Sequence, residues 1–253
     1  MKDMQELLKK LVFTTEEALE YFPNRNNAFY YLKKSVQDNK ISKIKNGLYA
    51  LINPATQTVY VDKYMIASKI NKGSFIAYHS ALEFYGKANQ VFTTVYVGST
   101  ERFATFEYDG LQYKFVYYPV TADIENIQSS TDIVVTSYEQ TLIDCVDKVD
   151  LAGGSEELIK AFMDCQEANV DKLLTIVKRY ANKCLYQKVG FIFEKFNNLL
   201  NLPQSFFEEC ERNIGKSVIY FMQDLGYKGS VSYKWKIIAP DFPPELGYTK
   251  EIK

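Results

Sequence analysis

Residues 24–52 read NRNNAFYYLKKSVQDNKISKIKNGLYALI, a polar turn followed by a helical pattern and by two short alternating runs. The helical pattern spans about residues 26–38. With Leu32 at the centre of its buried face, four further residues lie within about 60° of that centre. These four are Ala28, Phe29, Ser35 and Val36. We therefore expect one face of this helix to pack against the rest of an N-terminal domain.

The opposite face of the same helix holds no acidic residue. Its members are Asn26, Asn27, Tyr30, Lys33, Lys34 and Gln37. Asparagine and glutamine bond bidentately to adenine edges, and lysine and tyrosine reach guanine or phosphate. A helix face that only meets water more often mixes Glu with Lys, so a plain solvated face is the less favoured alternative. The face favours nucleic-acid recognition.

The two alternating runs, 41–45 and 48–52, flank the dipeptide Asn46-Gly47. Asn-Gly between such runs predicts a β-hairpin with a type I′ turn, because both central residues of that turn need φ > 0. Pairing across this turn places Ile44 opposite Tyr49 on one face of the hairpin. The lysines on the other face are Lys43 and Lys45.

Two helices are expected before this segment. Residues 3–11 have leucines at helical spacing. Thr14 and Glu17 have the spacing of a capping box, with Thr15 as the alternative cap, and open a short helix that ends at Pro23.

Three helices followed by a basic two-stranded hairpin is the element order of a winged helix-turn-helix. We therefore predict that residues 1–58 form a winged helix-turn-helix domain that binds double-stranded DNA through its third helix. In the groove we expect Asn26, Asn27, Tyr30, Lys33 and Lys34, and on phosphates we expect Arg25, Lys43 and Lys45. A winged helix that acts as a scaffold for protein interaction, without specific DNA binding, is the alternative.

Charge is distributed unevenly along the 253 residues. The formal net charge is −1, but residues 1–58 carry +3 and residues 59–253 carry −4. Residues 24–47 alone carry +5, so a neutral average conceals a basic patch.

Composition excludes several function classes. A single histidine excludes His-rich metal sites and multi-histidine catalysis. The four cysteines form no C-x-x-C pair and fit neither a zinc ribbon nor a disulfide-stapled miniprotein, so we expect buried reduced thiols in a cytoplasmic protein. They are Cys145, Cys165, Cys184 and Cys210. No secretory signal or membrane-spanning run is visible, and no membrane partner is expected.

Residues 59–253 predict a second, mixed α/β domain that is helix-rich from about 138 to 225, which makes the chain an α+β protein. Helices are expected at 59–72, 78–86 and 138–149, followed from 156 to about 225 by helices that break near Asn169, Tyr186 and Pro203. Strands are expected at 94–97, 103–108, 111–118, 133–135 and 229–238, with a two-residue turn at Asp109-Gly110 and an irregular tail over 240–248.

Three stretches of the chain resemble the AbiEi-type antitoxin and transcriptional regulator family. They are KNGLYAL at 45–51, YHSALEFYG at 78–86 and VTSYEQTLIDC at 135–145, and the last is followed by the pair Gly153-Gly154. Their order and spacing carry the resemblance over about residues 10–160. One departure is Gln140, which stands where the family often has arginine.

The resemblance implies a bacterial type IV toxin–antitoxin or phage-defence context. A protein of this kind would repress its own operon by binding inverted repeats through the winged helix. Its C-terminal domain would oppose a nucleotidyltransferase-like toxin, with or without direct contact.

His79 does not predict a catalytic site. Its neighbours in sequence offer only Ser80 and Glu83 as partners, and no G-x-S-x-G surrounds the serine. A structural histidine is therefore favoured, and we expect no enzymatic activity.

Other candidate motifs also favour structural roles, so no cofactor or metal is expected. The carboxylates Asp144, Asp147 and Asp150 recur every three residues but lack a second acidic cluster, which favours a solvated helix end over a Mg²⁺ site. Gly153-Gly154 is expected to end one helix, with Ser155 capping the next. An α/β enzyme of unknown chemistry, with a metal or a cofactor, remains a third alternative.

Overall fold

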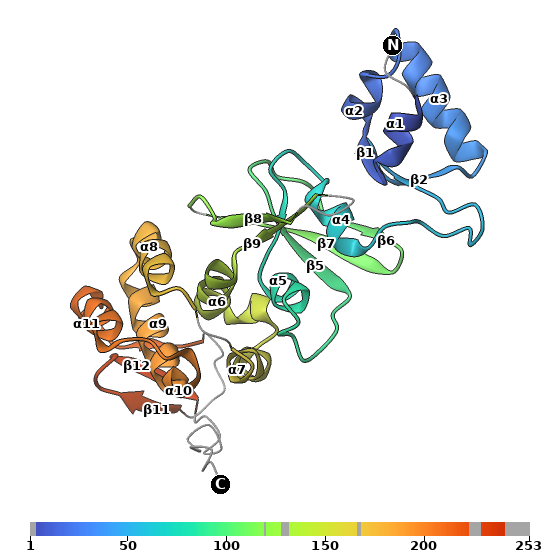
Figure 1. The fold of residues 1–253 in the computed structure, drawn as a ribbon. Coiled ribbons are helices and arrows are strands. Elements are labelled where there is room, and N and C mark those ends of the chain that lie inside the picture. Colours follow the sequence, from blue (N-terminus) through green and yellow to red (C-terminus); the bar gives the residue numbers. More distant parts are fainter. Residues whose placement is uncertain (1–3, 119, 128–131, 166–167, 223–228, 241–253) are drawn as a thin grey trace. The chain divides into compact units, whose positions relative to one another are not determined.

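The computed structural model of the protein describes residues 4–118, 120–127, 132–165, 168–222 and 229–240 (Figure 1). Helices and strands are mixed throughout these residues, which confirms the expected α+β class. The chain packs as two compact units. The first comprises Met1–Ala77, Phe92–Tyr118 and Ile124–Val135, and the second comprises Tyr78–Val91, Pro119–Asp123 and Thr136–Lys253. Each unit is built from three separate stretches of the sequence, so the division between the units does not correspond to one boundary near residue 58.

Three helices and a three-stranded antiparallel sheet begin the first unit. The helices are α1 (Met4–Lys9), α2 (Thr15–Leu19) and α3 (Arg25–Gln37), and the strands are β1 (Val12–Thr14), β2 (Ile41–Lys45) and β3 (Leu48–Leu51). The strand order is β1-β3-β2. The sequence does not predict β1, because three residues are too few to show an alternating pattern. One buried cluster joins these elements: Leu7, Phe13, Ala18, Tyr21, Leu32, Ile41 and Tyr49.

The start of α2 has the capping box that the sequence predicts. The Thr14 hydroxyl accepts a hydrogen bond from the Glu17 backbone N–H at 3.1 Å, and the Glu17 carboxylate accepts one from the Thr14 N–H at 2.8 Å. Asn24 caps α3 in a similar way, since its Oδ1 accepts from the Asn27 N–H at 2.9 Å. Both caps fix the chain direction at the start of a helix.

The β2–β3 hairpin forms where it is expected but in a different register. Lys43 lies opposite Tyr49 and Lys45 lies opposite Leu48, with an irregularity between the two lysines. Ile44 is therefore not paired with Tyr49, as the sequence predicts, but occupies a bulge. The bulge buries the Ile44 side chain and offsets the two lysines from each other.

The turn of this hairpin is also not the expected one. Gly47 has φ +84°, but Asn46 is not among the described residues with positive φ, so the turn is not type I′. By contrast, Asp109 and Gly110 both have positive φ, at 51° and 72°, which fits a type I′ turn in the second expected hairpin.

A six-stranded sheet forms most of the remainder of the first unit. Its order is β6-β7-β5-β4-β9-β8. The strands are β4 (Phe75–Ile76), β5 (Thr94–Gly98), β6 (Phe106–Tyr108), β7 (Leu111–Val116), β8 (Ile124–Ile127) and β9 (Ile133–Thr136). The helix predicted over 59–72 is reduced to α4 (Lys63–Ser68), because Asp62 caps it and Val59 instead forms an isolated β-bridge with Ile52.

Helices make up most of the second unit (Figure 1). They are α5 (His79–Phe84), α6 (Tyr138–Asp147), α7 (Ser155–Met163), α8 (Val170–Tyr180), α9 (Lys183–Lys195), α10 (Asn197–Leu200) and α11 (Gln204–Asn213), with a 3-10 helix at Val149–Ala152. A small sheet of order β10-β12-β11 follows, built from β10 (Ile219–Tyr220), β11 (Gly229–Ser232) and β12 (Ile237–Pro240).

Two of the three predicted helix breaks are confirmed. Asn169 caps α8 and Pro203 immediately precedes α11. The break expected near Tyr186 is wrong, because that residue is buried inside α9. The chain breaks earlier, at Ala181, whose φ of +48° is left-handed, and Asn182 caps the next helix.

Two further local predictions need correction. The strand expected over 229–238 is an antiparallel hairpin, since β11 and β12 pair with each other. Gly153 does end a helix with a left-handed φ of +96°, but Ser155 is the first helical residue and Gly154 occupies the cap position. Pro240 ends β12, and the rest of the expected tail lies outside the described residues.

Candidate nucleic-acid interface

Helix α3 presents the polar face that the sequence predicts. Asn26, Asn27, Lys33, Lys34 and Gln37 are all exposed. Tyr30 is 70% exposed, so this ring also faces solvent and is not part of the domain core. No acidic residue lies in α3. The face therefore joins amide groups, a phenol and two ammonium groups on 13 residues of helix.

The buried face of α3 is narrower than predicted. Ala28, Leu32 and Ser35 are buried, but Phe29 is 42% exposed and Val36 is 36% exposed. The prediction that these last two pack in the core is wrong, because the short α2 and the small sheet cover only one stripe of the helix. Apolar surface thus borders the polar face.

Arg25 stands at the start of α3, next to one of these exposed rings. Its guanidinium carbon lies 5.3 Å from the centroid of the Phe29 ring, a cation–π distance. The side chain is exposed and has no acidic neighbour in the first turn of the helix. A cation held in this way remains accessible to a phosphate.

A shallow hollow of about 230 Å³ connects α3 to the hairpin. Its lining residues are Leu32, Lys33, Val36, Gln37, Lys43 and Tyr49. The hollow therefore brings Lys33 of the helix and Lys43 of β2 to one surface, although ten positions separate them in the sequence. Lys43 is exposed, as expected for a phosphate contact.

Lys45 does not share this surface. Its side chain is half-buried, and its ammonium nitrogen lies 5.3 Å from the Phe103 ring centroid and 5.4 Å from that of Phe106. Burial lowers the pKa of Lys45 from its ordinary value. This lysine lines a different hollow of about 670 Å³, together with residues of α2 and of the segment after α4. Its expected place beside Lys43 is thus not what the structure has.

His79 belongs to a buried structural arrangement. Its Nε2 lies 3.2 Å from Oε1 of Glu157, and both side chains are buried. The same carboxylate oxygen accepts from the backbone N–H groups of Asn89 and Gln90, at 2.6 and 3.0 Å. The pair ties α5 and α7 to the 86–91 loop within the second unit, which fits the structural role that the sequence predicts.

Asp144 contradicts the prediction of a solvated helix end. It is fully buried in α6, and one of its carboxylate oxygens accepts from the Tyr180 hydroxyl at 2.5 Å and from the Gln140 amide at 2.6 Å. Gln140 also accepts from the Asp123 N–H at 3.1 Å. Gln140 is therefore the centre of a buried polar network. Desolvation and the nearby Asp144 carboxylate raise the pKa of Tyr180.

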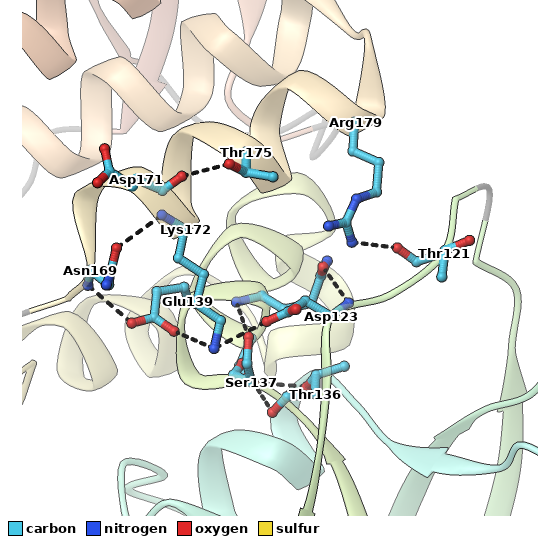
Figure 2. A network of polar contacts seen from close by, with 12 residues as sticks. Thr121, Asp123, Thr136, Ser137, Glu139, Asn169, Asp171, Lys172, Thr175 and Arg179 are labelled. Atoms are coloured by element: carbon cyan, nitrogen blue, oxygen red, sulfur yellow. Dashed lines mark hydrogen bonds and ion pairs between the residues drawn. The ribbon is translucent and has the colours of Figure 1, made fainter.

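A second polar network of this unit is built around Lys172 (Figure 2). The Lys172 ammonium lies 3.1 Å from Oδ2 of Asp123 and 3.3 Å from Oε2 of Glu139. Asn169 donates its backbone N–H to Glu139 at 3.0 Å, and Arg179 donates to the Thr121 carbonyl at 2.7 Å. Burial favours a raised pKa for Asp123, but hydrogen bonds and the ammonium group hold that pKa below its ordinary value. These contacts join α6, α8 and the 120–123 segment.

The thiols and carboxylates of the described residues form no metal site. No group of three or more His, Cys, Asp or Glu side chains there could hold a metal ion. All four cysteines are unpaired, but Cys184 is exposed and Cys165 is half-buried, so the prediction of four buried thiols is wrong. Burial raises the pKa of Cys165 to about 11 and of Cys210 to about 12. No described helix is long and apolar enough to cross a bilayer.

Comparisons with known proteins define the fold but not the function. No family model and no curated protein matches the chain. Among solved structures, the chain is similar to the crystal structure of the RV2827C protein from Mycobacterium tuberculosis, with a TM-score of 0.65. The two are 13% identical, and the match covers 93% of this chain and 89% of that one. The protein thus shares an overall α+β fold with a distant relative in structure.

Proposed function

We propose that residues 1–58 are a winged helix-turn-helix that binds double-stranded DNA, and that the protein is a transcriptional regulator of antitoxin type. The observation that carries the proposal is the acid-free exposed face of α3, which shares one surface with Lys43 of the hairpin. Exposed cations neutralise phosphates and release counterions, which gives sequence-independent affinity. Amides beside them suit base edges in the major groove.

Two observations support the winged-helix interpretation. The order α1, β1, α2, α3, β2, β3 places the candidate recognition helix immediately before a hairpin. The sheet order β1-β3-β2 leaves β2 at an edge, where Lys43 is free to reach a neighbouring phosphate. The groove residues are then Asn26, Asn27, Tyr30, Lys33 and Lys34, with Arg25 and Lys43 on phosphates and Lys45 supporting the hairpin through its aromatic contacts.

Binding of the whole protein to duplex DNA tests the proposal. A duplex is selected from a random-sequence pool, and its affinity is followed by fluorescence anisotropy as a function of salt. The variant Lys33→Ala/Lys34→Ala removes two exposed ammonium groups, so we expect weaker binding and a log–log salt slope that is smaller by about 0.9 per lost phosphate contact.

The matched control is Lys183→Ala/Lys216→Ala, which removes the same charge from exposed positions of the second unit. We expect this control to retain the affinity and slope of the wild type. Equal loss in both double variants would mean that net charge and not the α3 face drives binding. No duplex bound at low salt would overturn the proposal.

The antitoxin part of the proposal rests on the AbiEi resemblance of residues 45–51, 78–86 and 135–145. In this role the protein represses its own operon at inverted repeats and opposes a nucleotidyltransferase-like toxin in the cytoplasm. Expression of the neighbouring reading frame is expected to arrest growth, and co-expression of this chain is expected to restore it. A neighbouring gene with no effect on growth would overturn the antitoxin role but not DNA binding.

The second candidate function is a protein-interaction module. The exposed apolar groups on α3 favour it, since Phe29, Tyr30 and Val36 are 42%, 70% and 36% exposed. In this case the helix would bury those groups against a partner protein. In this case the double variant Lys33→Ala/Lys34→Ala would leave any DNA affinity unchanged.

A further inference from the structure

The hollow between α3 and β2 combines an apolar floor with a cationic rim. Leu32 and Tyr49 are buried, at 1% and 8% exposure, and form the floor with the half-open Val36. The polar lining groups are Lys33, Gln37 and Lys43, all exposed, and none of the lining residues is acidic.

The size of this hollow limits what it can hold. At about 230 Å³ it is smaller than pockets for free cofactors or drug-sized ligands, which occupy about 300–1,000 Å³. A single sugar ring of a nucleic-acid strand is a better match, because the ring has an apolar face and is linked to a phosphate on each side. The ammonium groups of Lys33 and Lys43 on the rim would each bind one of these phosphates.

The spacing of the lining residues along α3 sets the direction in which a bound strand would cross the hollow. Leu32 and Val36 are four residues apart and form one row on the helix, and Lys33 and Gln37 form the adjacent row. Lys43 approaches from β2. A strand of nucleic acid that lies over the apolar row therefore has one cation from the helix and one from the hairpin.

We propose that this hollow seats one deoxyribose of one DNA strand, with the two phosphates that flank this sugar bound by Lys33 and Lys43. Lys33 then contacts the DNA backbone at the edge of the groove and not a base. The inference rests on the proposed DNA binding and specifies it further. Deoxyribose has only carbon and hydrogen at C2′, which suits contact with Val36. A ribose carries a hydroxyl at C2′. Against the apolar Val36 side chain this hydroxyl would lose its hydrogen bonds to water and gain none in return. The protein would thus select DNA over RNA at this nucleotide.

The test uses the whole protein and the duplex selected for it. Each phosphate in turn is replaced by an uncharged methylphosphonate, and each sugar in turn by ribose. With the wild type, we expect two phosphates at which neutralisation weakens binding about tenfold, equal to about 1.4 kcal/mol. We also expect one sugar between these phosphates at which replacement of deoxyribose by ribose weakens binding by the same factor.

The variants assign each contact. Lys33→Ala is expected to abolish the effect of neutralisation at one of these phosphates, and Lys43→Ala at the other. Val36→Ala opens space at the sugar and is expected to reduce the penalty for ribose. Lys34→Ala, on the same helix but outside the hollow, is the control and should remain sensitive at both phosphates.

The outcomes separate this inference from the function on which it rests. Lys33 and Lys43 assigned to different strands, or to phosphates more than one sugar apart, would overturn the inference while DNA binding stands. The inference would also be overturned if ribose had no effect on binding at any position. Absence of binding to any duplex would overturn the proposed function as well. The three lysines are exposed, so circular dichroism is expected to show unchanged folding in their variants.

Discussion

Glu17 is a single side chain that connects three parts of the first unit. One of its oxygens completes the capping box of α2 at 2.8 Å from the Thr14 nitrogen. The other lies 2.9 Å from the Lys10 ammonium and 3.5 Å from that of Lys69. The sequence predicts the capping contact because it is local. The two lysine contacts depend on the tertiary structure, since Lys69 lies 52 positions away.

The environment of Glu17 makes part of the stability depend on pH. Burial alone would raise the pKa of Glu17, but hydrogen bonds from Lys10 and Thr14 outweigh it and hold that pKa below 4.5. The folded state therefore binds this proton less readily than the unfolded state. The stabilisation is present above about pH 4.5 and is lost as the pH falls through the lowered folded pKa.

We expect Glu17→Gln to remove this pH dependence. Glutamine keeps the capping box but not the charge. In urea unfolding at a series of pH values, the wild type should be the more stable protein above about pH 4.5, and the difference should shrink on further acidification. Glu16→Gln, exposed in the same helical turn, is the control. A difference that stays constant down to pH 2 would contradict the assignment.

At the scale of elements, α9 and the β11–β12 hairpin are held together by Trp235. This residue is the only tryptophan in the chain and is 1% exposed. Its indole N–H donates to the Glu194 carboxylate at 2.6 Å, and its ring lies against the backbone of Gly190. A Cβ at Gly190 would come within 2.1 Å of the Trp235 ring, so α9 requires glycine there.

We expect Gly190→Ala to displace the indole and to destabilise the fold by about 1–3 kcal/mol, since overpacking forces ring and helix apart. Intrinsic fluorescence reports this directly, because Trp235 is the sole tryptophan, and its emission should shift to the red. Lys183→Ala, exposed on the same helix, is expected to leave both emission and stability near the wild type. An unchanged spectrum for the glycine variant would contradict this packing.

At the scale of the whole molecule, residues 1–58 make stabilising contacts with residues from later in the chain. Val59 bridges to Ile52, and the Tyr60 N–H donates to the Leu51 carbonyl at 3.1 Å. The Tyr108 hydroxyl donates to the Ser42 hydroxyl at 2.8 Å. The hairpin of the candidate DNA-binding domain is thus supported by residues from later in the chain.

We expect a fragment of residues 1–58 to be less stable than the same residues in the full chain, by about 2 kcal/mol for two lost hydrogen bonds and the lost contacts of Lys45 with the Phe103 and Phe106 rings. Hydrogen exchange at the Tyr49 and Ala50 amides of β3 measures this loss. A fragment of residues 1–77 keeps the contacts of Val59 and Tyr60 and should be intermediate. Equal protection in all three proteins would show that the later residues do not support the hairpin.

The sequence alone determines where the helices and the hairpin of the first 58 residues lie, though not the register or turn of the hairpin, and it determines the polar face of α3. These are properties of consecutive residues, since caps, periodicity and charge act over a few positions. The candidate groove residues from Asn26 to Lys34 are therefore found without coordinates.

Only the tertiary structure decides which lysine of the hairpin joins that face. A bulge at Ile44 offsets the two lysines, so Lys43 faces the α3 hollow while Lys45 turns to Phe103 and Phe106. Burial of Asp144 and the interleaving of the two units depend in the same way on residues that are distant in sequence. Local patterns carry no information about such contacts, because they form only when the chain has packed.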